Sequence, residues 1–168
     1  MTKNVRVRIL AIDPGTKHMG VALLDNGALI YSGVKVIRNR RSPHEIIREC
    51  RKIVLRLIRD YRPQVLMSEK TFFANNRNSA LLNVLFDEIR NIGKRKKLQV
   101  ICYAPTTVKK AICGNGLAKK EEVARVVIAK FPELKVFLTQ DRKWKESFHH
   151  NMFDAVALGM MVGKQKRG

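Results

Sequence analysis

The chain has 168 residues, enough for one packed domain, and 45% of them are hydrophobic. It carries 34 Lys and Arg against 14 Asp and Glu, so its formal net charge is +20 and its isoelectric point lies near 10.5. Because such an excess of positive charge repels itself in a compact chain, it favours a polyanionic partner, with nucleic acid ahead of a membrane surface. A solvated basic face or association with the ribosome is the alternative. No apolar run has the length of a membrane span, so we expect no membrane partner.

The cysteines bear on the compartment of the protein. Cys50, Cys102 and Cys113 are odd in number, lie in apolar segments and form no CxxC pair. We therefore expect reduced core thiols in a cytoplasmic protein. The first residues hold only a short apolar run, which does not fit a signal peptide.

The beginning of the chain predicts an antiparallel meander. Residues 5–12 alternate and then run apolar into Asp13-Pro14-Gly15, which is typical of a central strand that ends at a turn. A second strand is expected at residues 20–24. Asn26-Gly27 then supplies the favoured two-residue hairpin into a third strand at residues 28–37.

The rest of the chain alternates between helices and two further strands. Ser42 and Glu45 form a capping box with Pro43 at the first helical position, and this helix ends before Pro63. The remaining strands are expected at residues 65–68 and 98–103. The remaining helices are expected at residues 80–92 (with Gly93 as C-cap), from 105 to near 114, at 119–131 and at 152–162. This order predicts one α/β domain of the ribonuclease H type over residues 1–168, with a short basic tail at residues 164–168. Its sheet is mixed and five-stranded, with three antiparallel strands followed by parallel ones, and it is flanked by helices.

Three carboxylates stand out in this plan. Asp13 and Glu69 each follow an apolar strand, and ligands of open α/β sheets bind at the edge where such strands end. An unpaired carboxylate in an apolar setting costs several kcal/mol, and a hard cation such as Mg²⁺ relieves that cost. Asp154 lies among apolar residues near the start of the last expected helix. Small residues there would let the helix pack close to the sheet and bring Asp154 towards Asp13. On a chain of charge +20, the three together indicate a nuclease.

Each carboxylate also has a structural explanation. Asp13 before Pro-Gly is a common turn residue. Glu69 is able to pair with a neighbouring lysine such as Lys70. Asp154 in a first helical turn would interact favourably with the helix dipole.

Four blocks of the sequence resemble the RuvC family of Holliday-junction resolvases. Residues 9–16, closing on Gly20, resemble the first motif of the family, and residues 69–72 resemble the second, in which an aromatic residue stands three places after the glutamate. Residues 108–123 resemble its basic segment, and residues 154–158 its last motif. The blocks occur in the family's order over residues 8–161, nearly the whole chain.

The resemblance implies an activity and a set of partners. It implies paired phosphodiester cuts on opposing strands of four-way junctions and other branched DNA, made by a homodimer. A branch-migration complex is a further candidate partner. The leucine-rich face of the helix at residues 80–92 is a candidate dimer interface, with core packing against the sheet as the alternative.

The resemblance also implies roles for individual residues. Asp13, Glu69 and Asp154 would be the catalytic ligands of two Mg²⁺ ions, with Mn²⁺ as a substitute. For DNA binding, Lys109 and Lys120 would face the phosphates, with Lys110 and Lys119 as close rivals. Phe72 would stack on bases at the junction centre, unless it is a core aromatic beside Phe73.

One position departs from the family pattern. RuvC nucleases carry Asp or His three residues before the last aspartate, and this chain has Asn151 there, preceded by His149 and His150. Either Asn151 ligates a metal through its amide oxygen, or His150 replaces it.

Two other functions fit parts of the sequence. Asn151 allows a catalytically silent RuvC-like protein that binds nucleic acid or acts in ribosomal RNA processing. Ile12-Asp13-x-Gly15-Thr16 also resembles the first phosphate loop of actin-type and sugar-kinase-type ATPases. Those ATPases need a second related domain, for which 168 residues leave little room.

Overall fold

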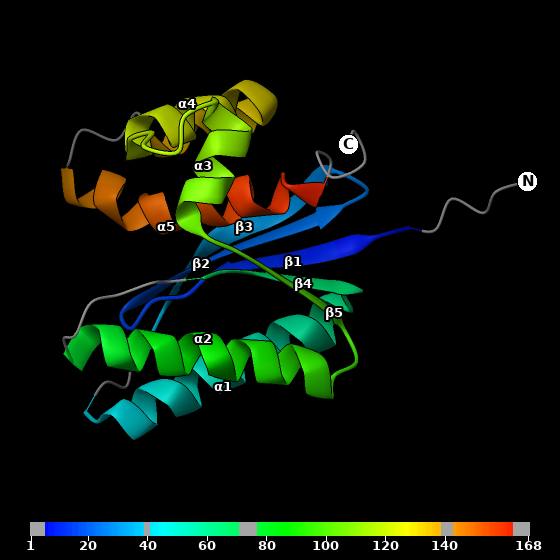
Figure 1. Cartoon of the computed structure of the whole chain (residues 1–168), viewed down its shortest axis with the longest axis vertical. Coiled ribbons are helices and arrows are strands. Elements are labelled where there is room, and N and C mark those ends of the chain that lie inside the picture. Colours follow the sequence, from blue (N-terminus) through cyan, green and yellow to red (C-terminus); the bar gives the residue numbers. More distant parts are fainter. Residues whose placement is uncertain (1–5, 39–40, 71–76, 139–142, 163–168) are drawn as a thin grey trace, which may run out of the picture.

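The computed structural model describes residues 6–38, 41–70, 77–138 and 143–162 (Figure 1). Its elements, in chain order, are β1 (Arg8–Asp13), β2 (His18–Asp25), β3 (Ala28–Val36), α1 (Pro43–Tyr61), β4 (Val65–Glu69), α2 (Arg77–Arg95), β5 (Gln99–Tyr103), α3 (Pro105–Cys113), α4 (Lys120–Lys130), the 3-10 helix η1 (Pro132–Phe137) and α5 (Lys143–Gly159).

The strands form one mixed five-stranded sheet in the order β3-β2-β1-β4-β5. Strand β2 pairs antiparallel with both β1 and β3, whereas β4 pairs parallel with both β1 and β5. The hairpin between β2 and β3 forms because Asn26 and Gly27 both take positive φ angles, 51° and 85°, as the favoured two-residue turn requires. The predicted fold class, sheet and hairpin are therefore confirmed.

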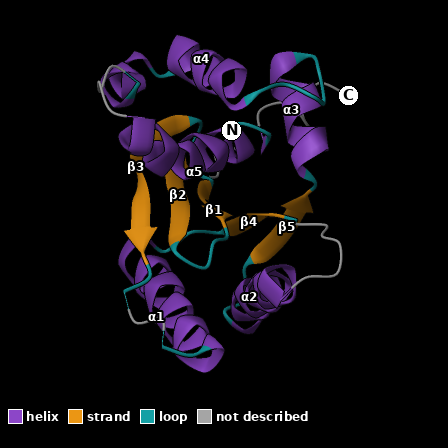
Figure 2. Ribbon diagram, turned by 90° about the vertical axis from the view of Figure 1, so that its left-hand side faces the viewer, coloured by secondary structure: helices purple, strands orange, loops and turns teal. Residues whose placement is uncertain are grey.

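Helices cover both faces of the sheet. In Figure 1, α3, α4 and α5 lie on one side and α1 and α2 on the other, and Figure 2 shows α1 under the β3 side of the sheet and α2 under the β5 side. Successive residues of a strand point to opposite faces. In β1, Ala11 therefore packs in the core under α3, α4 and α5, while Leu10 and Ile12 pack in the core over α1 and α2.

Helix α1 begins where its sequence predicts. The Ser42 hydroxyl accepts a hydrogen bond from the Glu45 backbone N–H at 3.2 Å, and Pro43 occupies the first turn. The helix ends at Arg62, which takes the left-handed conformation with φ at 48°.

Two sequence expectations about the helices were wrong, and one short helix was not predicted. Gly93 is not a C-cap, because α2 continues to Arg95 and Gly93 lies buried inside it. A Cβ there would stand 2.7 Å from the side chains of both Leu66 and Val100, so the glycine serves close packing of helix on sheet. Helix α5 begins at Lys143 rather than at residue 152. The 3-10 helix η1 was not predicted.

The leucine-rich face of α2 packs in the core. Leu85, Ile89 and Ile92 are buried against the sheet, and Leu81 and Leu82 pack partly buried on the same core. Core packing therefore explains part of this face, while Val84 of the same helix is 48% exposed, so the dimer interface stays a prediction. None of the three cysteines forms a disulfide, and Cys50 is buried. None of the helices in the described part of the chain has the length and apolar character needed to cross a bilayer.

Candidate active site

Two carboxylates lie on neighbouring strands at one edge of the sheet. Asp13 ends β1 and Glu69 ends β4, and the register of these parallel strands places Ile12 opposite Ser68. Asp13 follows Ala11 by two residues and Glu69 follows Met67 by two, and both of these apolar residues face the α5 side. Because side chains alternate along a strand, both carboxylates face α5 as well.

A glycine on β2 lets α5 bring in the third carboxylate. Gly20 pairs with Asp13 in the β-ladder. A Cβ on Gly20 would stand 1.8 Å from the carbonyl oxygen of Asn151, so the helix backbone rests directly on this glycine. Asp154 follows Asn151 by about one helical turn, which places it over the same edge of the sheet.

The position of Asp154 within α5 differs from the expectation. The helix starts at Lys143, so Asp154 lies in its interior and an interaction with the dipole of the first turn does not explain it. The expected close packing of helix on sheet is present, with Ala155 and Ala157 fully buried. The part played by Gly20 was missed, and its signal was a glycine inside an otherwise apolar strand.

The three carboxylates perturb one another. Burial, followed by the charges of Glu69 and Asp154, raises the pKa of Asp13 well above its usual range. Burial and then the charge of Asp154 raise the pKa of Glu69 to about 7. Burial also raises the pKa of Asp154. Without a cation, the structure therefore opposes full ionisation of this cluster near neutral pH.

Two lysines partly offset this repulsion. Lys109 of α3 and Lys120 of α4 line a pocket of about 170 Å³ together with Glu69 and Asp154. The charge of Lys120 lowers the pKa of all three carboxyl groups, and that of Lys109 lowers the pKa of Glu69 and Asp154. The pocket is completed by Pro105, Val108, Val123 and Ala157.

The loop between α3 and α4 positions Lys120. Gly114 ends α3 with φ at 78°, and the backbone N–H of Lys119 donates to the Glu122 carboxylate at 2.6 Å to begin α4. Lys120 is thus the first residue of α4. Lys110 and Lys119 are exposed and are not part of the pocket lining. Of each neighbouring pair, the structure brings Lys109 and Lys120 to the carboxylates.

His150 and Asn151, the two candidates for a fourth metal ligand, make different interactions near the site. The charge of His150 lowers the pKa of Asp154, which it precedes by four residues on α5. The Asn151 amide nitrogen donates a hydrogen bond to the His18 carbonyl oxygen at 3.4 Å. His149 is turned to an aromatic neighbour, with its ring 4.7 Å from that of Phe137. Phe72, predicted at the junction centre, lies outside the described residues.

The carboxylates of the site suit a metal ion that takes further ligands from the bound substrate. Within the described ranges, no three His, Cys, Asp or Glu side chains are grouped closely enough to hold a metal ion by themselves. Mg²⁺ typically takes one or two carboxylates and completes its octahedron with water and substrate phosphates. Buried carboxylates with raised pKa values next to phosphate-sized space fit that mode of binding.

Comparison with known proteins identifies relatives. The family model described as "Crossover junction endodeoxyribonuclease RuvC" matches residues 9–141, a segment that holds Asp13, Glu69 and both pocket lysines and ends before Asp154. The crossover junction endodeoxyribonuclease RuvC of Pseudomonas fluorescens is 33% identical over 125 residues, which are 71% of each chain.

Two solved structures share the fold. The RuvC structure of Thermus thermophilus superposes with a TM-score of 0.72 at 23% identity, over 96% of both chains. The Thermus thermophilus RuvC in complex with a Holliday junction substrate also gives 0.72, at 20% identity over 96% of this chain and 95% of that one.

Proposed function

Because the chain belongs to the RuvC family of crossover junction endodeoxyribonucleases, we propose that it resolves four-way DNA junctions by paired cuts on opposing strands. The observation that carries this proposal is the pocket at the carboxyl ends of β1 and β4. There, Glu69 and Asp154 line the pocket with two lysines, and their charges raise the pKa of the buried Asp13 beside it. On a chain of charge +20, that combination suits hydrolysis of a polyanion.

Asp13, Glu69 and Asp154 would hold the metal ions of the site. Nucleases of this family depend on divalent metal ions, and we propose two Mg²⁺ ions, with Mn²⁺ as a substitute. When bound, two such ions supply an activated water and stabilise the charges of an in-line displacement. Ligation would also relieve the repulsion that raises the carboxyl pKa values.

The remaining residues would hold the DNA and orient the site. Lys109 and Lys120 would bind the non-bridging oxygens of the scissile phosphate, where their ammonium groups also offset the carboxylates. Phe72 would stack on bases at the junction centre. His150 or Asn151 would supply the fourth ligand, because they precede Asp154 by four and three residues on α5 and so lie within about one helical turn of it.

The substrate has consequences for assembly. A four-way junction is two-fold symmetric, so two simultaneous cuts suit a C₂ homodimer with one pocket per protomer. The exposed side of α2, which includes Val84, stays the candidate dimer surface, because of the leucines of this helix only Leu85 is fully buried. A branch-migration complex remains a candidate partner. We also propose a cytoplasmic site of action, where cysteines that form no disulfide are expected.

Neither rival function is favoured by the pocket. A catalytically silent binder would not require buried carboxylates to be gathered against their mutual repulsion. The ATPase alternative rests on the resemblance of residues 12–16 alone, whereas the RuvC family model matches residues 9–141.

The proposal is tested by cleavage of a labelled four-way junction with Mg²⁺ and with EDTA. Asp13→Asn should lower the cleavage rate by a factor of at least about 10³, because residues that act as one unit fail together. It should leave junction binding intact or stronger, because a carboxylate that repels phosphate is removed. Asp25→Asn is the matched control, since Asp25 is buried to a similar extent but pairs with Arg8 away from the pocket. Junction binding without Mg²⁺-dependent cutting by the wild type would contradict the proposed activity.

A further inference from the structure

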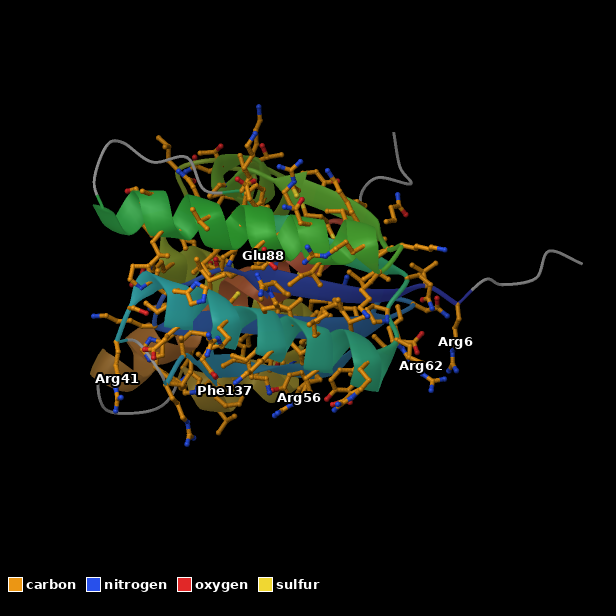
Figure 3. All side chains as sticks on the ribbon, turned by 90° about the horizontal axis from the view of Figure 1, so that it is seen from below. Arg6, Arg41, Arg56, Arg62, Glu88 and Phe137 are labelled. Carbon is orange, nitrogen blue, oxygen red and sulfur yellow. The ribbon has the colours of Figure 1, made fainter. Side chains whose placement is uncertain are left out.

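A second concentration of positive charge lies at the end of the molecule opposite the pocket. The strands β1, β4 and β5 begin there, and α1 and α2 end there. Four exposed cations define what we name the basic pole: Arg56, Arg62, Lys96 and Lys97. Figure 3 shows Arg62 beside Arg6 at this end, with Arg56 further along α1 and Arg41 at the other end of that helix.

Backbone hydrogen bonds tie the segments of the basic pole together. Gln64, two residues after Arg62, donates from its backbone N–H to the Arg8 carbonyl at 2.9 Å. Gln99, two residues after Lys97, donates in the same way to the Gln64 carbonyl at 3.0 Å. The loops that carry Arg62 and Lys97 are therefore neighbours, held rigidly at the start of adjacent strands.

The acidic side chains that reach this end are already engaged by other cations. Asp25 pairs with Arg8 at 3.0 Å and with Arg6 at 3.6 Å. Glu88, about two turns before the end of α2, accepts from Arg51 at 2.8 Å and from Arg95 at 3.1 Å. Asp60 pairs with Arg59 at 2.8 Å. Within the described part of the chain, the four cations of the basic pole have no carboxylate partner, and their mutual repulsion is left for an external anion to relieve.

The helix dipole does not account for these cations. A positive side chain in the last turn of a helix is stabilised by the dipole, and Arg59, Lys94 and Arg95 occupy such positions. Arg62, Lys96 and Lys97 lie past the helix ends instead. Arg62 and Lys97 also take positive φ angles of 48° and 59°, where glycine or asparagine is the favoured residue. Long cations occupy two positions that the backbone alone would fill with a smaller residue.

The basic pole does not reach the nucleotides in the pocket. Strand β4 has five residues and separates Glu69 from the pole by roughly 15 Å at 3.3 Å per residue, on the opposite side of the sheet from α5. DNA that meets the pole is therefore DNA beyond the cleaved phosphodiester. The guanidinium forks of Arg56 and Arg62 suit the oxygens of phosphate, and the lysines add mobile point charges.

From this arrangement we infer that the basic pole binds the phosphate backbone of a duplex arm of the DNA whose branch point occupies the active site. The inference rests on the proposed function for the identity of the DNA. The pole contributes affinity and holds the direction of the arm, and it takes no part in the bond-breaking step.

The test compares two triple variants that lose the same charge. Arg62→Asn, Lys96→Gln and Lys97→Asn together remove three cations of the basic pole, with asparagine chosen because it tolerates the left-handed conformation. Arg51→Gln, Lys52→Gln and Arg59→Gln remove three cations of α1 that are already paired with carboxylates. Junction binding is measured against salt concentration in EDTA, and thermal melting confirms that both variants fold.

The expected result is a change in salt dependence for the first variant alone. Each phosphate contact contributes about 0.9 to the slope of log K against log salt, so the loss of three contacts should lower the slope by about 2.7. The rate of cleavage at saturating protein should be unchanged. On a junction whose arms are cut back to a few base pairs, the two variants should bind alike.

Three outcomes would overturn the inference. Equal slopes for the wild type and the pole variant would mean that these cations face no DNA. Equal losses in both triple variants would mean that only net charge matters. A difference that survives on short arms would place the contacts at the branch point. A wild type that binds but does not cut would instead refute the proposed function, and these binding results would still decide the role of the pole.

Discussion

Replacing Gly20 with alanine should leave the protein folded but slow its cleavage of DNA, because this glycine sets the distance between α5 and the sheet. The new Cβ would stand 1.8 Å from the Asn151 carbonyl oxygen and 2.3 Å from its carbonyl carbon, whereas Cβ contacts under 3.0 Å essentially do not occur. Both obstructing atoms are backbone, so no side chain is able to rotate away. The helix backbone has to retreat by at least about 1.2 Å at Asn151, about one turn before Asp154.

Because α5 has to move, we expect a large loss of cleavage rate and only a moderate loss of stability against unfolding. Overpacking of this kind costs roughly 1–3 kcal/mol, which lowers the melting temperature by about 2–4 °C per kcal/mol for a chain of this size. A displacement of about 1 Å in a reacting group costs on the order of 10²-fold in rate. Gly20→Ala should therefore fold and bind junctions at moderate temperature yet cleave them about a hundredfold more slowly under single-turnover conditions.

Gly159→Ala is the matched control at the other end of the same helix. Its Cβ would meet the Leu24 side chain, with Cδ1 at 2.3 Å, and a leucine end is able to move while the backbone stays. This variant should lose stability but keep its cleavage rate. The reasoning fails if folded Gly20→Ala cuts at the wild-type rate, or if both variants lose activity in proportion to their loss of stability.

Further predictions concern the charges of the site. The folded pKa of Glu69 is about 7, above the ordinary 4.5. The metal-free protein should therefore lose stability as pH rises from about 4.5 to 7, and Glu69→Gln should flatten that dependence in melting experiments with EDTA. Lys120→Gln should slow cleavage strongly and shift its pH profile upwards, because Lys120 lowers the pKa of all three carboxyl groups. Lys119→Gln, one residue outside the pocket, should have little effect, and equal losses would refute the assignment. His150→Ala should raise the Mg²⁺ concentration for half-maximal cutting more than Asn151→Ala does, and the reverse order would make Asn151 the ligand.

The strands and two of the carboxylates could be predicted because their signals are local. A buried strand requires an apolar run, and a charged residue at its end stands out against that run, as Asp13 and Glu69 do. The hairpin at Asn26-Gly27 is equally local, since positive φ angles are demanded of two adjacent residues.

The extent of α5 and the choice between adjacent lysines depend on tertiary contacts. Residues 143–151 have a polar composition without a clear apolar period, so nothing local extends the helix back to Lys143. Lys109 and Lys110 are separated by about 100° around a helix, and the rotation of α3 decides which one enters the pocket. That rotation follows from the burial of Val108 and Ile112 against α4 and α5, which a single sequence does not reveal.

Asn151 shows how the departure from the family pattern is accommodated by the fold. Its amide nitrogen donates to the His18 carbonyl at the start of β2, a bond that a carboxylate, which only accepts, is unable to make. This hydrogen bond lies next to the point where the backbone of α5 packs on Gly20, so Asn151 helps to hold in place the helix that carries Asp154. A carboxylate at 151 would add a fourth negative charge to a cluster whose pKa values are already raised by repulsion. This hydrogen bond uses the amide nitrogen and leaves the amide oxygen of Asn151 free, so the comparison of His150→Ala with Asn151→Ala decides which residue would supply the fourth ligand.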